Sequence, residues 1–174
     1  MSTLSKAKNG DNEAFTMLIE EFKLPMYKTA KAILKDEDDV CDAVQDALIS
    51  IYRNLGSLKN DDYLKTWIIR ITINKCYDLI TKRNSNNKKI VEMQSEFNEV
   101  TYSTENQETK TDLERALSLI DNDLKIVTVL YYYDDIPVKD IADIMGIPVG
   151  TVKSKLSRAR EKLYEILKQE EVKL

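Results

Sequence analysis

The sequence predicts an all-α protein of two small helical domains joined by a flexible linker, with a helix-turn-helix in the second domain. Only 4 Gly and 3 Pro occur among the 174 residues, so the chain has few natural breaks in helices. Most apolar residues recur at three-to-four spacing, the period of an amphipathic helix. A polar segment divides the chain, and we expect domains at 1–83 and 112–174 with an acidic polar linker at 84–111.

The first domain is expected to begin with two helices separated by a proline. Asp11 is suited to cap a helix over 11–22, whose apolar residues fall on one face. Pro25 should interrupt or kink the chain, because proline lacks the backbone N–H that a helix interior needs. Residues 26–34 are therefore expected to form a second, short helix.

Two longer helices are expected in the rest of the first domain. The acidic run at 36–39 suits a helix start, because carboxylates stabilise the positive end of the helix dipole. Apolar residues follow at helical spacing as far as Leu55, and Gly56 should end this helix. After a polar loop, a further helix is expected from about 63 to 82. Its single tryptophan, Trp67, is more typical of a core residue than of one that stacks on DNA.

The linker is rich in Glu, Asn, Gln, Ser and Thr, and one short helical piece is expected near 90–97.

In the second domain, Asp121 is suited to cap a helix, and Pro137 suits the first turn of another. Apolar stripes indicate helices in this domain at about 113–120 and 124–133, one with Pro137 in its first turn that contains Ile141, Ile144 and Met145, and a last one that starts at 149–151.

The residue types that carry most enzymatic chemistry are scarce. The chain has no His, which removes the commonest general base and metal ligand. Cys41 and Cys76 are isolated, which argues against a zinc site, and both are expected to be buried thiols. We therefore expect no catalytic residue, no metal and no cofactor. The sequence has neither a long apolar run nor the apolar core of a signal peptide, so a cytoplasmic protein is expected.

A basic stretch lies near the end of an acidic protein. Residues 147–163 hold five basic residues and one acidic residue, in a chain of net charge −4. A local patch steers binding to nucleic acid more than the total charge does. On a helical wheel the apolar residues of this stretch fall in one sector and should face the core. Two basic flanks enclose short polar side chains on the other side.

The residues before this stretch have the order of a helix-turn-helix. Ala142 is small where a crossing helix must approach, Gly146 stands where the chain leaves one helix, and Thr151 is suited to cap the next. Two basic flanks suit a major groove, because cations reach phosphates on either side while short side chains approach base edges. The alternative is a solvated basic face, which is common on any helix.

These motifs resemble those of a known family. Gly150-Thr-Val-Lys-Ser-Lys-Leu-Ser-Arg-Ala-Arg-Glu-Lys-Leu163, preceded by Ile141-Ala and Gly146-Ile-Pro, is similar to the C-terminal DNA-binding region of extracytoplasmic-function (ECF) sigma factors of the sigma-70 family. In the first half, residues 10–15, 39–48 and 67–78 resemble the conserved core region of that family in order and spacing. The resemblance covers about 9–83 and 112–168.

The resemblance implies a sigma subunit of bacterial RNA polymerase, of the minimal two-domain kind, rather than an enzyme. A helix over 40–54 would bind the coiled coil of the largest polymerase subunit. The loop at 54–63 would capture an unstacked base of the −10 element, and the helix at 63–83 would face the opening duplex. The last helix would read the −35 element, the polymerase flap is a further implied contact, and the linker would run near the RNA exit path.

The resemblance also implies site residues, which fall into three sets by their expected role. The polymerase-binding set is Asp42, Gln45, Asp46 and Ile49. The −10 set is Asn60, Asp61, Tyr63, Lys65, Arg70, Asn74, Lys75, Lys82 and Arg83. The −35 set is Thr151, Lys153, Ser154, Lys155, Ser157, Arg158, Arg160 and Lys162.

The partners implied are core polymerase, promoter DNA and an anti-sigma factor that holds the protein inactive, in some members of the family from the inner face of the membrane. No small-molecule substrate is implied.

The chain departs from the family pattern at four positions. Lys125 and Lys155 stand where Arg is usual, Thr81 where a basic residue is common, and Asp121 where proline is frequent. Lys presents a point charge instead of the planar fork with which Arg binds guanine.

Two alternatives stay open at this point. An ordinary helix-turn-helix regulator would bind DNA without polymerase, but this leaves the motifs at 39–48 and 67–78 without a role. A helical adaptor would use its faces only for protein contacts, but this leaves the basic residues at 153–162 without a role.

Overall fold

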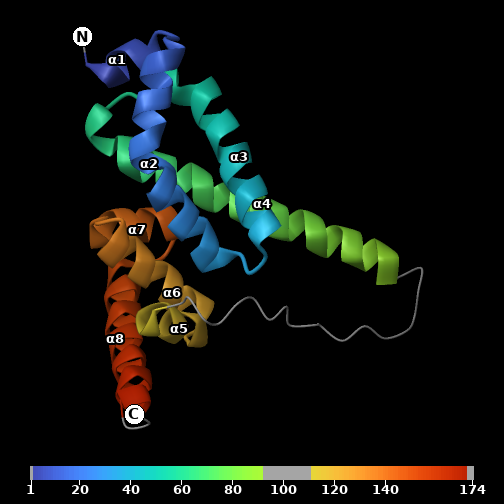
Figure 1. The fold of residues 1–174 in the computed structure, drawn as a ribbon, viewed down its shortest axis with the longest axis vertical. Coiled ribbons are helices and arrows are strands. Elements are labelled where there is room, and N and C mark those ends of the chain that lie inside the picture. The colour runs from blue at the N-terminus through green and yellow to red at the C-terminus, as the bar shows by residue number, and fades with distance from the viewer. Residues whose placement is uncertain (1, 92–110, 172–174) are drawn as a thin grey trace.

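The computed structural model describes residues 2–91 and 111–171, and the regular elements of this part of the chain are all helical (Figure 1). The predicted all-α class is therefore confirmed. Helices α1–α4 pack together at the N-terminal end, and α5–α8 form a second group beneath them in the view of Figure 1. Within the described residues, no helix is both long enough and apolar enough to cross a lipid bilayer.

The N-terminal group begins with α1 (Thr3–Lys8), a short helix that the sequence pattern did not predict. It is followed by α2 (Asn12–Ile33), α3 (Glu37–Asn54) and α4 (Leu64–Val91), with short 3₁₀ turns at 55–57 and 61–63. Two of these helices start with an aspartate cap, which was predicted at Asp11, while at Asp36 only an acidic helix start was predicted. Asp11 accepts a hydrogen bond from the Ala14 N–H at 3.0 Å, and Asp36 accepts one from the Asp38 N–H at 3.0 Å.

The predicted break at Pro25 is wrong, because α2 continues through this proline to Ile33. Met26 and Ala30, which follow the proline, are completely buried and continue the apolar face formed earlier in the helix by Leu18 and Ile19. A proline in a helix interior costs about 3 kcal/mol. Burial of large apolar side chains contributes about 1.5–3 kcal/mol each, so the packing of this face outweighs the missing hydrogen bond.

The predicted end of the fourth helix near Lys82 is also wrong, since α4 continues to Val91. Residues 83–91 contain neither Gly nor Pro, and the low helix propensity of Asn is not sufficient to end a helix that is already formed. Most of the short helical piece expected near 90–97 lies outside the described residues.

The C-terminal group contains α5 (Asp112–Leu119), α6 (Asn122–Thr128), a π-helical turn (Val129–Tyr133), α7 (Val138–Met145) and α8 (Val149–Glu171). The helix predicted over 124–133 is thus divided between α6 and the π turn. Thr111 and Glu114 form a capping box at the start of α5. Gly146 has a φ of 64°, in the left-handed region, where it ends α7 as expected.

Two predicted caps of this group are not formed. Asp121 occupies the N-cap position of α6, but its side chain makes no capping hydrogen bond. Thr151 lies inside the first turn of α8 instead of capping it, because the helix already begins at Val149. The backbone N–H groups of Thr151 and Val152 donate to the Pro148 carbonyl, so the turn before α8 closes through backbone contacts.

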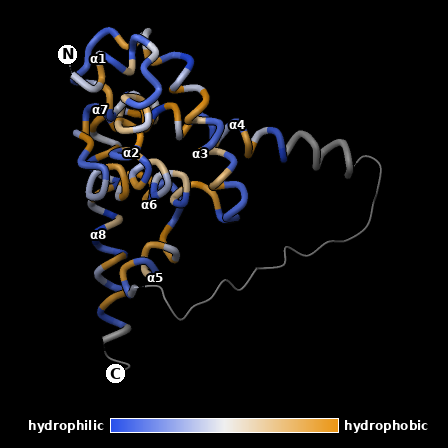
Figure 2. Tube along the Cα trace, turned by 45° about the horizontal axis from the view of Figure 1, so that its top comes forward, coloured by the Kyte–Doolittle hydropathy of each residue, from blue (hydrophilic) through white to orange (hydrophobic). Residues whose placement is uncertain are grey.

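An apolar core joins the two groups of helices, as the hydrophobic segments at the junction in Figure 2 illustrate. This cluster contains Ala30 and Ile33 of α2, Ile69 of α4, and Val127 and Leu130 from the C-terminal group. A second cluster lies within α1–α4, and a third between α5, α6 and α8. The described parts of the two groups are therefore packed against each other through a common core.

Polar contacts also cross this junction. The Thr29 hydroxyl donates to Asp134 Oδ2 at 2.7 Å, and Asp134 is completely buried. Its second carboxylate oxygen has no hydrogen-bond partner among the described residues. Burial raises the pKa of Asp134 from 3.8 to about 6, against the opposing effect of the Thr29 hydrogen bond. Above about pH 6 the junction therefore contains a buried carboxylate whose ionisation lowers the stability of the folded state.

Replacing Asp134 by Asn should stabilise the protein at neutral pH. The folded state holds the Asp134 proton more tightly than the unfolded chain, so this residue lowers stability as the pH rises from about 4 to about 6. Asp134→Asn should therefore raise the free energy of unfolding by about 1–3 kcal/mol above this window and by little below it. Urea unfolding at both ends of the window measures the difference. An equal gain at both pH values, or a gain from Asp143→Asn on the exposed face of α7, would contradict this assignment.

Candidate functional site

The basic helix α8 is held by one apolar face. Val152 is completely buried, Leu156 and Ala159 are nearly so, and Leu163 packs against the cluster between α5, α6 and α8. The sector predicted from the helical wheel is therefore confirmed. Because this face is fixed against the core, the remaining positions of the same turns must face outward.

The outward positions of α8 contain the residues expected to contact DNA. They form two flanks, one with Lys155, Arg158 and Lys162 and the other with Lys153 and Arg160, as the wheel predicted. Lys153, Ser154, Arg158, Arg160 and Lys162 are exposed, whereas Thr151, Lys155 and Ser157 are half-buried.

Two lysines of the first flank are bound to aspartates of α6. Lys155 Nζ lies 2.8 Å from Asp123 Oδ2, and Lys162 Nζ lies 2.6 Å from Asp121 Oδ2. The Lys162 hydrogen bond lowers the pKa of Asp121. With Arg158, these four residues line an open hollow of about 460 Å³ between the start of α6 and α8. Sequence reasoning missed this contact, because 32 and 41 positions separate the paired residues.

The residues expected at the −10 element lie at the start and along α4. Asn60, Asp61, Tyr63, Arg70, Asn74, Lys82 and Arg83 are exposed, and Lys65 and Lys75 are half-buried. Trp67 is half-buried and packs against the core of α1–α4, as expected. This outer side of α4 therefore offers polar and basic groups over much of its length.

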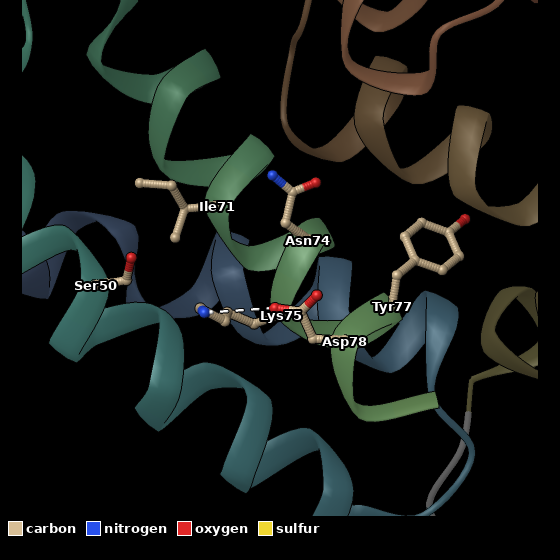
Figure 3. Close-up of a pocket in the computed structure, with 6 residues that line it drawn as sticks. All are labelled: Ser50, Ile71, Asn74, Lys75, Tyr77 and Asp78. Carbon is tan, nitrogen blue, oxygen red and sulfur yellow. Dashed lines mark hydrogen bonds and ion pairs between the residues drawn. The ribbon is translucent and has the colours of Figure 1, made fainter. Parts of the chain in front are cut away.

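An open hollow of about 360 Å³ lies between α3 and α4 (Figure 3). Ser50 lines it from α3, and Asn74, Lys75 and Tyr77 are among the residues that line it from α4. Lys75 and Asp78 point towards each other, with Nζ and Oδ2 3.5 Å apart. Burial, with the charge of Asp123 as the next cause, raises the pKa of Tyr77. The hollow is therefore polar and close to the C-terminal helices.

Besides Lys75, two further residues expected at the −10 element form ion pairs within the chain. Arg83 Nη2 lies 2.5 Å from Asp39 Oδ1 at the start of α3. Asp61 accepts from Lys8 Nζ at 2.5 Å, and the same ammonium donates to the Leu58 carbonyl at 2.8 Å. Helix α1 thus ties the 57–62 loop to the N-terminal group, a role that the sequence pattern did not indicate.

The four residues expected to bind polymerase share one face of α3. Asp42, Gln45, Asp46 and Ile49 recur at intervals of three and four residues, and all four are exposed. Ile49 is 44% exposed although it is apolar. The opposite face of the helix, with Val40, Ala43, Ala47 and Ile51, is completely buried.

The cysteines differ from each other. Cys76 is buried, and burial raises the pKa of its thiol to about 12. The expectation that Cys41 is also buried is wrong, because it lies on the outward side of α3 and is exposed. Within the described residues, no group of three or more Cys, Asp or Glu side chains is arranged to hold a metal ion.

Comparisons with known proteins give a consistent result. The sequence matches the family models of sigma-70 region 2 over residues 18–86 and sigma-70 region 4 over residues 110–163. It is 30% identical over 173 residues to the ECF RNA polymerase sigma-E factor of Escherichia coli K12, covering 91% of this chain and 88% of that protein. It is 28% identical to the ECF RNA polymerase sigma factor SigM of Mycobacterium tuberculosis, covering 91% and 79%.

A solved structure with a similar fold is that of the sigma factor RpoE from Bartonella quintana, in complex with the anti-sigma factor NepR. It superimposes with a TM-score of 0.68 at 26% sequence identity, over 87% of this chain and 96% of that one.

Proposed function

Because the chain belongs to the ECF sigma factors of the sigma-70 family, we propose that it binds core RNA polymerase and directs it to a dedicated set of promoters. The observation that carries this proposal is the pairing of two surfaces in one chain. The N-terminal group presents an exposed face on α3, and the C-terminal group presents a basic helix with its apolar side buried. The protein acts by binding, and the polymerase carries out the chemistry.

The exposed face of α3 is the proposed polymerase contact. Asp42, Gln45 and Asp46 offer polar groups around Ile49, a large apolar side chain that is 44% exposed. Apolar side chains surrounded by polar groups are typical of protein interfaces. We assign this face to the coiled coil of the largest polymerase subunit, and the C-terminal group to the flap.

The 54–63 loop and α4 are the proposed −10 surface. Strand opening needs a place for an unstacked base and cations for the backbone. The hollow beside Asn74 is open and polar, and Arg70 and Lys82 are exposed on the same helix. Lys75 and Arg83 would exchange their carboxylate partners for phosphate. The proposed domains, 1–83 and 112–174, carry these two surfaces, and α4 continues beyond the first of them to Val91.

Helix α8 is the proposed −35 reader. Ser154 and Ser157 lie between the two basic flanks, where short side chains can approach base edges. Arg158 is exposed and has no ion-pair partner among the described residues, so its guanidinium is free to bind a phosphate or a guanine.

Reading both elements requires the two groups of helices to separate. The elements are named for positions about 25 base pairs apart, which is roughly 85 Å along B-DNA. In the structure the groups are in contact through Thr29 and Asp134. Twenty residues lie between Val91 and Asp112. A chain of this length spans at most about 70 Å, so it can bridge most of this distance once the two groups separate. Opening of this junction is therefore part of the proposed function.

The proposed antagonist is an anti-sigma factor, as in the RpoE–NepR complex. We propose that the protein acts in the cytoplasm, and that an antagonist of this class can hold it at the inner face of the membrane. An anti-sigma factor that kept the junction closed would prevent simultaneous binding of the two promoter elements.

The decisive experiment is run-off transcription with a bacterial core polymerase on genomic fragments. The full chain should produce transcripts that start at a small set of sites and are absent without it. Tight DNA binding with no polymerase association, or no dependence of any transcript on the protein, would overturn the proposal.

Replacing Asp42 and Gln45 together by Ala should weaken polymerase binding by about tenfold or more, because two polar contacts are removed from one exposed face. DNA binding by the full chain should not change, since α8 is on the other group of helices. Surface-immobilised core polymerase measures the first quantity, and Glu20→Ala on α2 serves as the exposed control. Loss of DNA binding would show that the double variant disturbs the fold.

Replacing Arg158 by Ala should have the reverse effect. Promoter-dependent transcription should fall by about tenfold, because a good side-chain contact to a base is worth about 1–3 kcal/mol. Association with polymerase should be unchanged. Arg115→Ala on α5 removes an exposed arginine from the same group of helices and is the matched control. Equal losses in both assays would contradict the assignment of α8.

A further inference from the structure

Two aspartates of α6 occupy one flank of the proposed −35 helix. Asp121 and Asp123 each bind one lysine of α8, at 2.6 Å and 2.8 Å. Asp121 stands at the N-cap position of α6, where its carboxylate would ordinarily accept a hydrogen bond from its own helix. It makes no such bond, and it accepts from Lys162 instead.

These ion pairs contribute little to the stability of the fold. The two aspartate side chains are 69% and 66% exposed, whereas the side chains of Lys162 and Lys155 are 49% and 17% exposed. Solvent screens ion pairs whose carboxylates are this exposed. The apolar contacts of Leu117, Leu124 and Ala159 already hold α8 against α5 and α6. The carboxylates are therefore not needed to position the helix, and their main effect is on the charge of its surface.

The two carboxylates remove most of the positive charge of this flank. Lys155, Arg158 and Lys162 give a charge of +3, and the two carboxylates reduce it to +1. DNA phosphates approaching this side meet two negative groups that already occupy the two lysines. On the other flank, Lys153 and Arg160 are exposed and have no carboxylate partner among the described residues. The two flanks thus differ in their availability to phosphate.

We propose that Asp121 and Asp123 compete with DNA phosphate for Lys155 and Lys162, and thereby limit the affinity of α8 for DNA of any sequence. This inference rests on the proposed function of α8 as a DNA-binding helix. Non-specific binding depends almost entirely on phosphate contacts, so it is the binding mode that the competition weakens directly. A sigma factor with this property occupies fewer non-promoter sites before it meets polymerase.

The test is to neutralise both carboxylates in the full chain. Asp121→Asn with Asp123→Asn should bind a short duplex of arbitrary sequence about tenfold more tightly at low salt, with each single variant giving an intermediate gain. The gain should disappear at about 1 M salt, where charges are screened within about 3 Å. Fluorescence anisotropy of a labelled duplex measures the affinity.

Two controls separate competition from other effects. Asp112→Asn removes the same charge from α5, where the carboxylate binds Arg115 and not α8, and should leave the affinity nearly unchanged. Asp121→Glu with Asp123→Glu keeps both charges and should bind DNA like the native protein. Circular dichroism compares the helix content of all the variants.

Unchanged or weaker binding by the double Asn variant would overturn the proposal, since it would mean that the aspartates are inert or that they aim the lysines at DNA. An equal gain in DNA affinity from Asp112→Asn would also overturn it, because the effect would then depend only on the net charge of the protein. The duplex assay contains no polymerase. If run-off transcription succeeds and this assay fails, the competition is wrong while the proposed function stands.

Discussion

The apolar core shared by α2, α4 and the C-terminal helices determines where the other surfaces of this protein lie. Ala30, Ile69 and Leu130 are completely buried in it although they come from three distant parts of the chain. Because protein interiors are closely packed, this contact fixes the rotation of each helix about its axis. Asp134 is the weak point of this core, since its buried carboxylate has one hydrogen bond and a raised pKa. A junction that buries such a group is less costly to open than a purely apolar one.

The same constraint makes the functional faces recognisable. On α3 and on α8, one line of small or branched apolar residues is buried, so the polar residues at the remaining positions have to face solvent. No separate structural device is needed to expose Gln45 or Arg158. Their exposure follows from the burial of Ala43 and Ala47 in one helix and of Leu156 and Ala159 in the other.

Sequence patterns were sufficient to predict the features that depend only on residues close together in the chain. The cap at Asp11, the acidic start of α3, the left-handed Gly146 and the buried sector of α8 all depend on residues within two helical turns. It failed where a distant contact decides the outcome. Helix α2 passes through Pro25 because its buried face is held by other helices, and α1 is tied down by the contact of Lys8 with the 57–62 loop. The ion pairs of α6 with α8 are of this second kind.

The distribution of charge in the protein is explained by these ion pairs between residues that are distant in the sequence. A net charge of −4 and a basic stretch at 147–163 look contradictory only if the charges are counted along the chain. In space, Asp121 and Asp123 lie beside Lys162 and Lys155, while Lys153 and Arg160 on the other side of α8 stay exposed. Acidic residues placed next to a basic helix lower its attraction for any polyanion without changing the side chains that face the bases. Affinity and sequence recognition can therefore be adjusted separately on one helix, since the first depends on the flanks and the second on the residues between them.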